Sequence, residues 1–81
     1  MIQVEVHVPA VGQSYEFEVN EHANVADIVK ELASMVSAQV GRSWANPDQL
    51  TLCYQEAGTV LPLQKTAYQC KIRPGSRLLL V

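Results

Sequence analysis

The residue types that could perform chemistry are few in this chain, and they form no recognisable catalytic motif. His7 and His22 lack a nucleophile elbow or any other local signature, so a Ser–His–Asp triad would depend on geometry that the sequence does not encode locally. Cys53 and Cys70 form neither a Cys-x-x-Cys pair nor a Cys/His cluster with zinc spacing. We therefore expect no enzyme activity, no metal and no cofactor.

Two other patterns have simpler structural interpretations. The four glycines are isolated, each at a predicted turn or helix end, and do not form a phosphate-binding loop. Glu16 and Glu18 could be paired carboxylates, with Glu21 beyond them. At a spacing of two in an edge strand they are more simply solvent-facing charges that discourage pairing with another strand.

Length and charge exclude several classes of protein. The 81 residues predict a single domain spanning 1–81, and a chain of this size buries only about 60–65% of its unfolded surface. The net charge is −2, and the six Lys and Arg residues are scattered, which argues against nucleic-acid binding. No apolar run approaches the roughly 18 residues of a membrane span, and the N-terminus lacks signal-peptide character. With two thiols expected to stay reduced, these features predict a cytoplasmic location and no membrane insertion.

The first half of the chain predicts two strands and a helix. Apolar residues alternate with polar ones over 2–8 and 14–19, which indicates a hairpin turning through Gly12. Asn24 is a suitable N-cap for a helix of about 16 residues, whose apolar stripe runs from Val25 to Val40. Gly41 occupies the position at which helices commonly end.

The second half predicts three more strands. We expect a loop over 42–49, strands over 50–55 and 59–61, and an irregular segment over 63–72 pinned by Leu63, Tyr68, Cys70 and Ile72. The last strand runs from Arg77 to Val81. The order β-β-α-β-β-β predicts an α+β fold with one helix on one face of a mixed sheet, and with the last strand central and parallel to the first.

The segment LPLQKTAYQCKIRPGSRLLLV, from Leu61 to Val81, resembles ubiquitin. In that superfamily it corresponds to a short strand, a one-turn helix, an apolar loop anchor at Ile72, and a Gly75-Ser76 turn into a final L-x-L strand. The resemblance covers essentially the whole chain as hydrophobic pattern and implies a ubiquitin-like β-grasp fold. Nothing follows Val81 in this sequence, so the Gly-Gly tail of conjugating members is missing, and we expect neither conjugation nor sulfur transfer.

Among tail-less forms, the chain is similar to the YukD/EsaB family. Those proteins are small cytoplasmic ubiquitin-like components of bacterial type VII (ESX-like) secretion loci, and a related domain forms the N-terminus of the EccD membrane subunit. The resemblance carries over no catalytic residue. It implies a non-conjugating adaptor whose partners are proteins, among them components of the secretion machinery.

The last strand also predicts where a partner would bind. If Leu78 and Leu80 face the helix, Leu79 and Val81 must face away from it, on the open side of the sheet. An apolar centre with a polar rim is typical of recognition surfaces, although two exposed aliphatic side chains can also be ordinary surface. Trp44 would be either a cap on the core or a second anchor. The predicted partner-binding residues are Leu79, Val81, Thr51, Cys53, His7, Arg77 and Trp44.

Other functions fit the same sequence. The chain could be a structural β-grasp subunit of a multicomponent enzyme, a sulfur carrier or modifier, or the excised N-terminal domain of a larger membrane protein. We expect a monomer or a weak dimer. The strand over 14–19 is the natural site for a dimer, but Glu16 and Glu18 argue against it.

Overall fold

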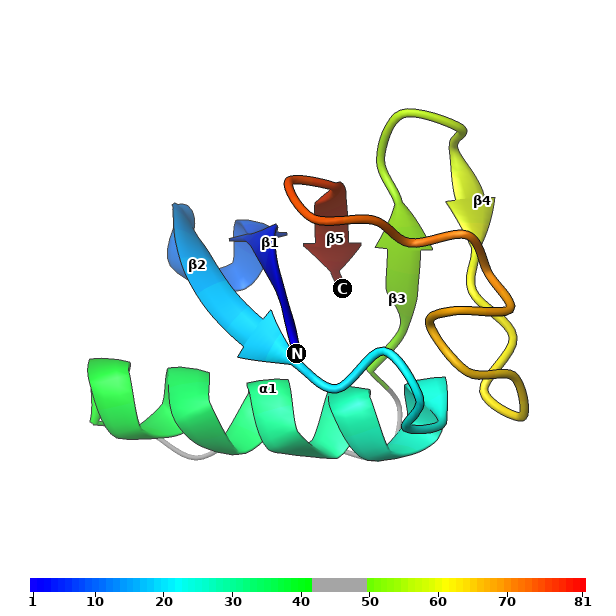
Figure 1. Cartoon of the computed structure of the whole chain (residues 1–81). Coiled ribbons are helices and arrows are strands. Elements are labelled where there is room, and N and C mark those ends of the chain that lie inside the picture. The colour runs from blue at the N-terminus through cyan, green and yellow to red at the C-terminus, as the bar shows by residue number, and fades with distance from the viewer. Residues whose placement is uncertain (42–49) are drawn as a thin grey trace.

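The structure is a computed structural model that describes residues 1–41 and 50–81. A five-stranded sheet lies across one side of a single helix, α1, among these residues (Figure 1). The elements are β1 (Ile2–Val8), a 3-10 turn (Pro9–Val11), β2 (Gln13–Val19), α1 (Val25–Val40), β3 (Leu52–Tyr54), β4 (Thr59–Val60) and β5 (Arg77–Leu80).

The strand order is β2-β1-β5-β3-β4, which places the last strand in the middle of the sheet. β5 runs parallel to β1 and antiparallel to β3. α1, the only α-helix among the described residues, connects the two halves of this mixed sheet and packs on one of its faces. The structure therefore confirms the predicted α+β fold, a ubiquitin-like β-grasp.

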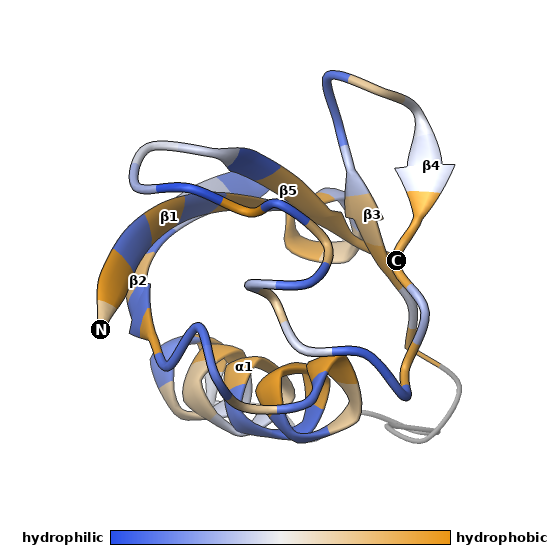
Figure 2. Cartoon of the chain, turned by 45° about the vertical axis from the view of Figure 1, so that its right-hand side comes forward, coloured by the Kyte–Doolittle hydropathy of each residue, from blue (hydrophilic) through white to orange (hydrophobic). Residues whose placement is uncertain are grey.

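The hairpin of β1 and β2 follows the predicted alternation. Its register pairs Ile2 with Val19 and Val8 with Gln13. Gly12 closes the turn with φ of 66°, a left-handed conformation that residues without a Cβ adopt most easily, and its N–H donates to the carbonyl of Pro9 at 3.1 Å. Figure 2 shows apolar and polar residues alternating along these strands.

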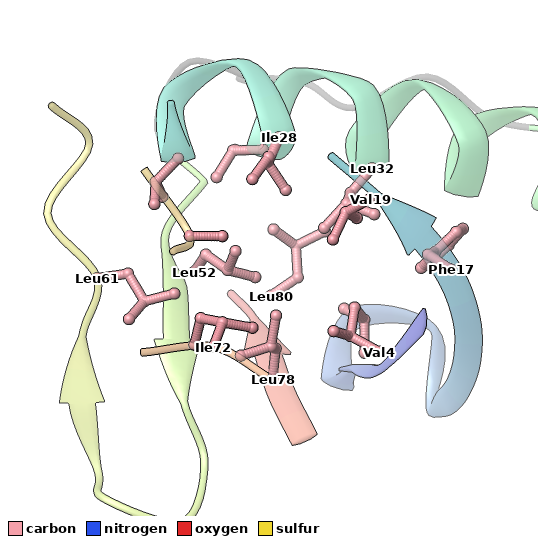
Figure 3. Close-up of a cluster of buried hydrophobic side chains, with 14 of the residues drawn as sticks. Val4, Phe17, Val19, Ile28, Leu32, Leu52, Leu61, Ile72, Leu78 and Leu80 are labelled. Atoms are coloured by element: carbon pink, nitrogen blue, oxygen red, sulfur yellow. The ribbon is translucent and has the colours of Figure 1, made fainter. Parts of the chain in front are cut away.

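The core lies between the inner face of the sheet and α1 (Figure 3). Leu78 and Leu80 are 2% and 1% exposed, so β5 contributes two fully buried side chains from the centre of the sheet. Opposite them, α1 buries most of the predicted stripe, namely Val25, Ile28, Val29, Leu32 and Val36, and also Ala33. Val40, at the end of the predicted stripe, is only half-buried. A helix with this many β-branched residues depends on such docking for its stability.

The two ends of α1 are completed in different ways. Gly41 has φ of 71° and donates its N–H to the carbonyl of Ser37, as expected for a glycine after the last turn. Asn24 occupies the N-cap position, but its side chain makes no capping hydrogen bond, which corrects the predicted role. The first amides of α1 donate instead to the carbonyls of Lys65 and Leu63, at 2.8 and 3.1 Å for Val25 and Ala26.

The segment over 63–72 differs from its predicted anchoring. Leu63 and Tyr68 are 48% and 64% exposed, so they do not pin it to the core. Ala67 and Ile72 do so, at 3% and 4% exposure, and Cys70 is half-buried against the core. The backbone carbonyls of Leu63 and Lys65 accept hydrogen bonds from the first amides of α1, so this end of the segment is held through its backbone and not through the Leu63 side chain. β3 and β4 are also shorter than the predicted strands over 50–55 and 59–61.

The register of β5 predicts that alanine substitutions at two neighbouring residues lower the stability by very different amounts. Leu80→Ala should lower the free energy of unfolding by about 2–5 kcal/mol, because it opens a cavity in the core. Val81→Ala, at a residue that is 49% exposed, should lower it by less than about 0.5 kcal/mol. Chemical denaturation of both variants measures the difference. Equal losses would contradict the register.

Candidate protein-interaction surface

The sheet surface opposite α1, which we call the outer face, carries one continuous row of side chains across all five strands. Leu79 on β5 is paired with His7 on β1 and with Cys53 on β3. His7 is paired with Ser14 on β2, and Cys53 with Val60 on β4. Directly paired residues point to the same face of a sheet, so these five side chains form a single line, the Leu79 row.

The apolar members of this surface are at least partly open to solvent. Val60 is 62% exposed and Val81 is 49% exposed, while Leu79 and Cys53 are half-buried. Val81 lies beside Thr51, and the two residues exchange backbone hydrogen bonds of 2.6 and 2.9 Å that extend the β3–β5 pairing. The C-terminal end of β5 therefore continues the aliphatic surface begun by Leu79.

A polar row borders the Leu79 row on the side toward the start of β5. Arg77 is paired with Glu5, and Glu5 with Glu16. The Arg77 Nε atom lies 3.6 Å from Glu5 Oε2, with both side chains largely exposed. Gln3 donates from Nε2 to Glu16 Oε2 at 2.9 Å. This side of the outer face is a rim of exposed hydrogen-bonding groups with an excess of carboxylates.

The described residues of the outer face bring together no catalytic constellation. His7 Nδ1 and Ser14 Oγ are 2.9 Å apart, on the exposed surface. No group of three or more His, Cys, Asp or Glu side chains in residues 1–41 and 50–81 is arranged to hold a metal ion. Aliphatic side chains lie at the centre of this surface with polar groups around them, an arrangement common in protein-interaction surfaces.

The structure brings most of the predicted site residues onto this one surface. Leu79, His7 and Cys53 lie in one row, Thr51 and Val81 are beside it, and Arg77 lies in the polar row. Trp44 lies outside the described residues. Val60 was missing from the prediction, although its position before an inward-facing Leu61 would have placed it outward by simple alternation.

Comparison with solved structures supports a ubiquitin-like domain. The chain is similar to the N-terminal ubiquitin-like domain in the 4931431F19Rik protein, with a TM-score of 0.74 and 29% identity over 99% of this chain and 72% of that one. It is also similar to a de novo design based on ubiquitin, with a TM-score of 0.68 and 22% identity over 99% of this chain and 85% of the design.

No protein-family model and no curated protein matches the chain. Within residues 1–41 and 50–81, no helix has the length and apolar character needed to cross a membrane.

The exposed ion pair of the polar row should contribute little to folding. A double-mutant cycle with Glu5→Gln and Arg77→Gln should give a coupling energy below about 1 kcal/mol, because water screens both groups. Added salt should reduce it further. Thermal or chemical denaturation of the two single variants and the double variant measures the coupling. A coupling of several kcal/mol, insensitive to salt, would show that these charges serve the fold rather than the surface.

Proposed function

We propose that this chain is a non-conjugating ubiquitin-like adaptor that binds a protein partner through the outer face of its sheet. The observation that carries the proposal is the Leu79 row, in which Leu79 lies between His7 and Cys53 at the centre of the sheet and Val60 extends the row to its edge. Binding through this surface requires no covalent step and no catalytic residue.

The outer face favours a partner with a particular chemistry. Leu79, Val81 and Val60 offer aliphatic contacts, and the polar row of Glu5, Arg77 and Glu16 flanks them. Interfaces of this kind gain most of their affinity from a few buried apolar or aromatic anchors, while the polar rim sets orientation. The matching partner surface presents an aliphatic or aromatic anchor over Leu79, with hydrogen-bonding groups toward the polar row.

We further propose that the chain acts in a bacterial type VII-like secretion system. It would work in the cytoplasm, and its partners would be components of the secretion machinery. The support for this role is the resemblance of Gly75 to Val81 to the usual ending of YukD/EsaB proteins, a Gly-[DS]-x-L turn into a short apolar strand. Gly75 has φ of 85° in the turn before β5, which fits such a turn.

Leu79→Asp tests the outer face directly. It should abolish partner binding, because a carboxylate replaces the central apolar contact, and should lower the free energy of unfolding by at most about 1–2 kcal/mol. Leu63→Asp is the matched control, since Leu63 is 48% exposed and lies beside the start of α1; it should bind normally. Calorimetric titration with the partner and thermal unfolding measure both effects. A collapsed fold in Leu79→Asp, or normal binding by it, would overturn the proposal.

The secretion role has its own test. Secretion ATPase and small helical substrate genes should lie beside the gene for this chain, and the tagged chain should co-purify with that ATPase, but not when it carries Leu79→Asp. Mass spectrometry of the native gene product should also show no C-terminal Gly-Gly. A processed Gly-Gly terminus, or a gene neighbourhood without secretion components, would contradict this part of the proposal.

A further inference from the structure

β2 is the longer of the two edge strands of the sheet. It has seven residues and has one neighbour, β1, among the described strands, whereas the opposite edge strand β4 has two residues. A long edge strand can accept another strand along its open side. β4, at the opposite edge, is too short to form a comparable set of backbone hydrogen bonds with an added strand.

The pairing of β1 shows which backbone groups of β2 face outward. The N–H of Glu5 donates to Ser76, and the carbonyl of Gln3 accepts from Gly75, so these residues direct their backbone groups toward β5. Val4 lies between these two residues and Val6 follows Glu5. Because successive residues of a strand direct their backbone groups to opposite sides, the N–H and C=O groups of Val4 and Val6 must point toward β2. Val4 pairs with Phe17 and Val6 with Tyr15, so Phe17 and Tyr15 direct their own N–H and C=O groups back toward β1. The residues of β2 that alternate with them direct these groups to the open edge of the sheet: Ser14, Glu16 and Glu18.

A groove runs beside this edge, between β2 and the later turns of α1. It is shallow and open to solvent, and it is lined by Glu16, Phe17, Met35, Ala38 and Gln39. Met35 is half-buried against the core and Ala38 is exposed. Figure 3 shows Phe17 at the β2 side of the core. The side chains of an added strand that point inward would enter this groove.

The charges along the edge select one kind of strand. β2 carries Glu16 and Glu18 on its outer face, and Glu31 lies one turn before Met35 on α1. No Lys or Arg occurs in 13–19 or in 31–41. A second copy pairing through β2 would bring its own Glu16 and Glu18 against these carboxylates, and directly opposed like charges destabilise a strand pair.

We propose that the β2 edge binds an extended segment of a partner protein in which basic and apolar residues alternate. The segment adds to the sheet beside β2, with hydrogen bonds to the backbone of Ser14, Glu16 and Glu18. Its basic side chains lie next to the carboxylates on the outer face. Its apolar side chains enter the groove against Phe17 and Met35. This site meets the Leu79 row at Ser14 and shares Glu16 with the polar row. It is nevertheless defined by the backbone edge of β2 and the groove toward α1, so a peptide titration tests it without the partner proposed for Leu79.

The probe is a synthetic peptide as long as β2 in which lysine and valine alternate. Titrated into the ¹⁵N-labelled chain, it should shift the amide resonances of Ser14, Glu16 and Glu18 most, and should slow their exchange with solvent. A peptide with glutamate in place of lysine should bind at least about tenfold more weakly, because it meets the same carboxylates. A lysine–valine peptide with a central N-methylated residue, which cannot complete the ladder, should also lose binding.

Two variants of the chain separate the charge from the groove. Glu16→Gln combined with Glu18→Gln should weaken the lysine–valine peptide by about tenfold and leave the unfolding midpoint unchanged. Ala38→Arg, at an exposed helix position, should abolish binding by filling the groove. Equal affinity for the glutamate peptide, shifts centred on Leu79 and Cys53, unchanged binding by Ala38→Arg, no binding of any peptide, or a β2-mediated dimer of the chain would each overturn the proposal.

Discussion

The position of β5 is the constraint on which the rest of the structure depends. This strand is hydrogen-bonded on both sides, to β1 and to β3, so a change in its register would shift two ladders at once. The turn before it fixes that register. Ser76 is 6% exposed, its Oγ accepts from the N–H of Arg73 at 2.9 Å, and its carbonyl accepts from the N–H of Glu5 at 2.9 Å. Gly75 adds a 2.7 Å bond to the carbonyl of Gln3.

The same strand separates the core from the surface that we propose for partner binding. Leu78 and Leu80 point toward α1, and the side chain between them must point the other way. In a domain this small, nearly every inward apolar residue is needed to cover the helix, so an aliphatic residue on the outer face is not explained by packing. Leu79 holds that position at the centre of the sheet, between His7 and Cys53. The proposed adaptor function rests on this arrangement.

The parts of the fold that depend on local periodicity could be predicted from the sequence. The alternation of apolar and polar residues predicted β1 and β2, and the apolar residues at helical spacing predicted α1. The L-x-L pattern predicted that Leu78 and Leu80 are buried and that Leu79 faces the other way. Contacts between distant segments could not be predicted in this way. The carbonyls of Lys65 and Leu63 replace the expected Asn24 cap, and the groove at Ala38 exists only because α1 ends its path beside β2.

The register of β5 separates the buried Leu78 and Leu80 from Leu79, the residue that we propose at the centre of the partner-binding surface. Methyl NMR with a soluble paramagnetic probe measures this separation directly in the free chain, without a substitution or a partner. We predict strong relaxation of the methyl groups of Val60 and Val81, clear relaxation of those of Leu79, and protection of those of Leu78 and Leu80. Protection of Leu79 with relaxation of Leu78 and Leu80 would show that the register is shifted by one residue, and would remove the proposed binding surface.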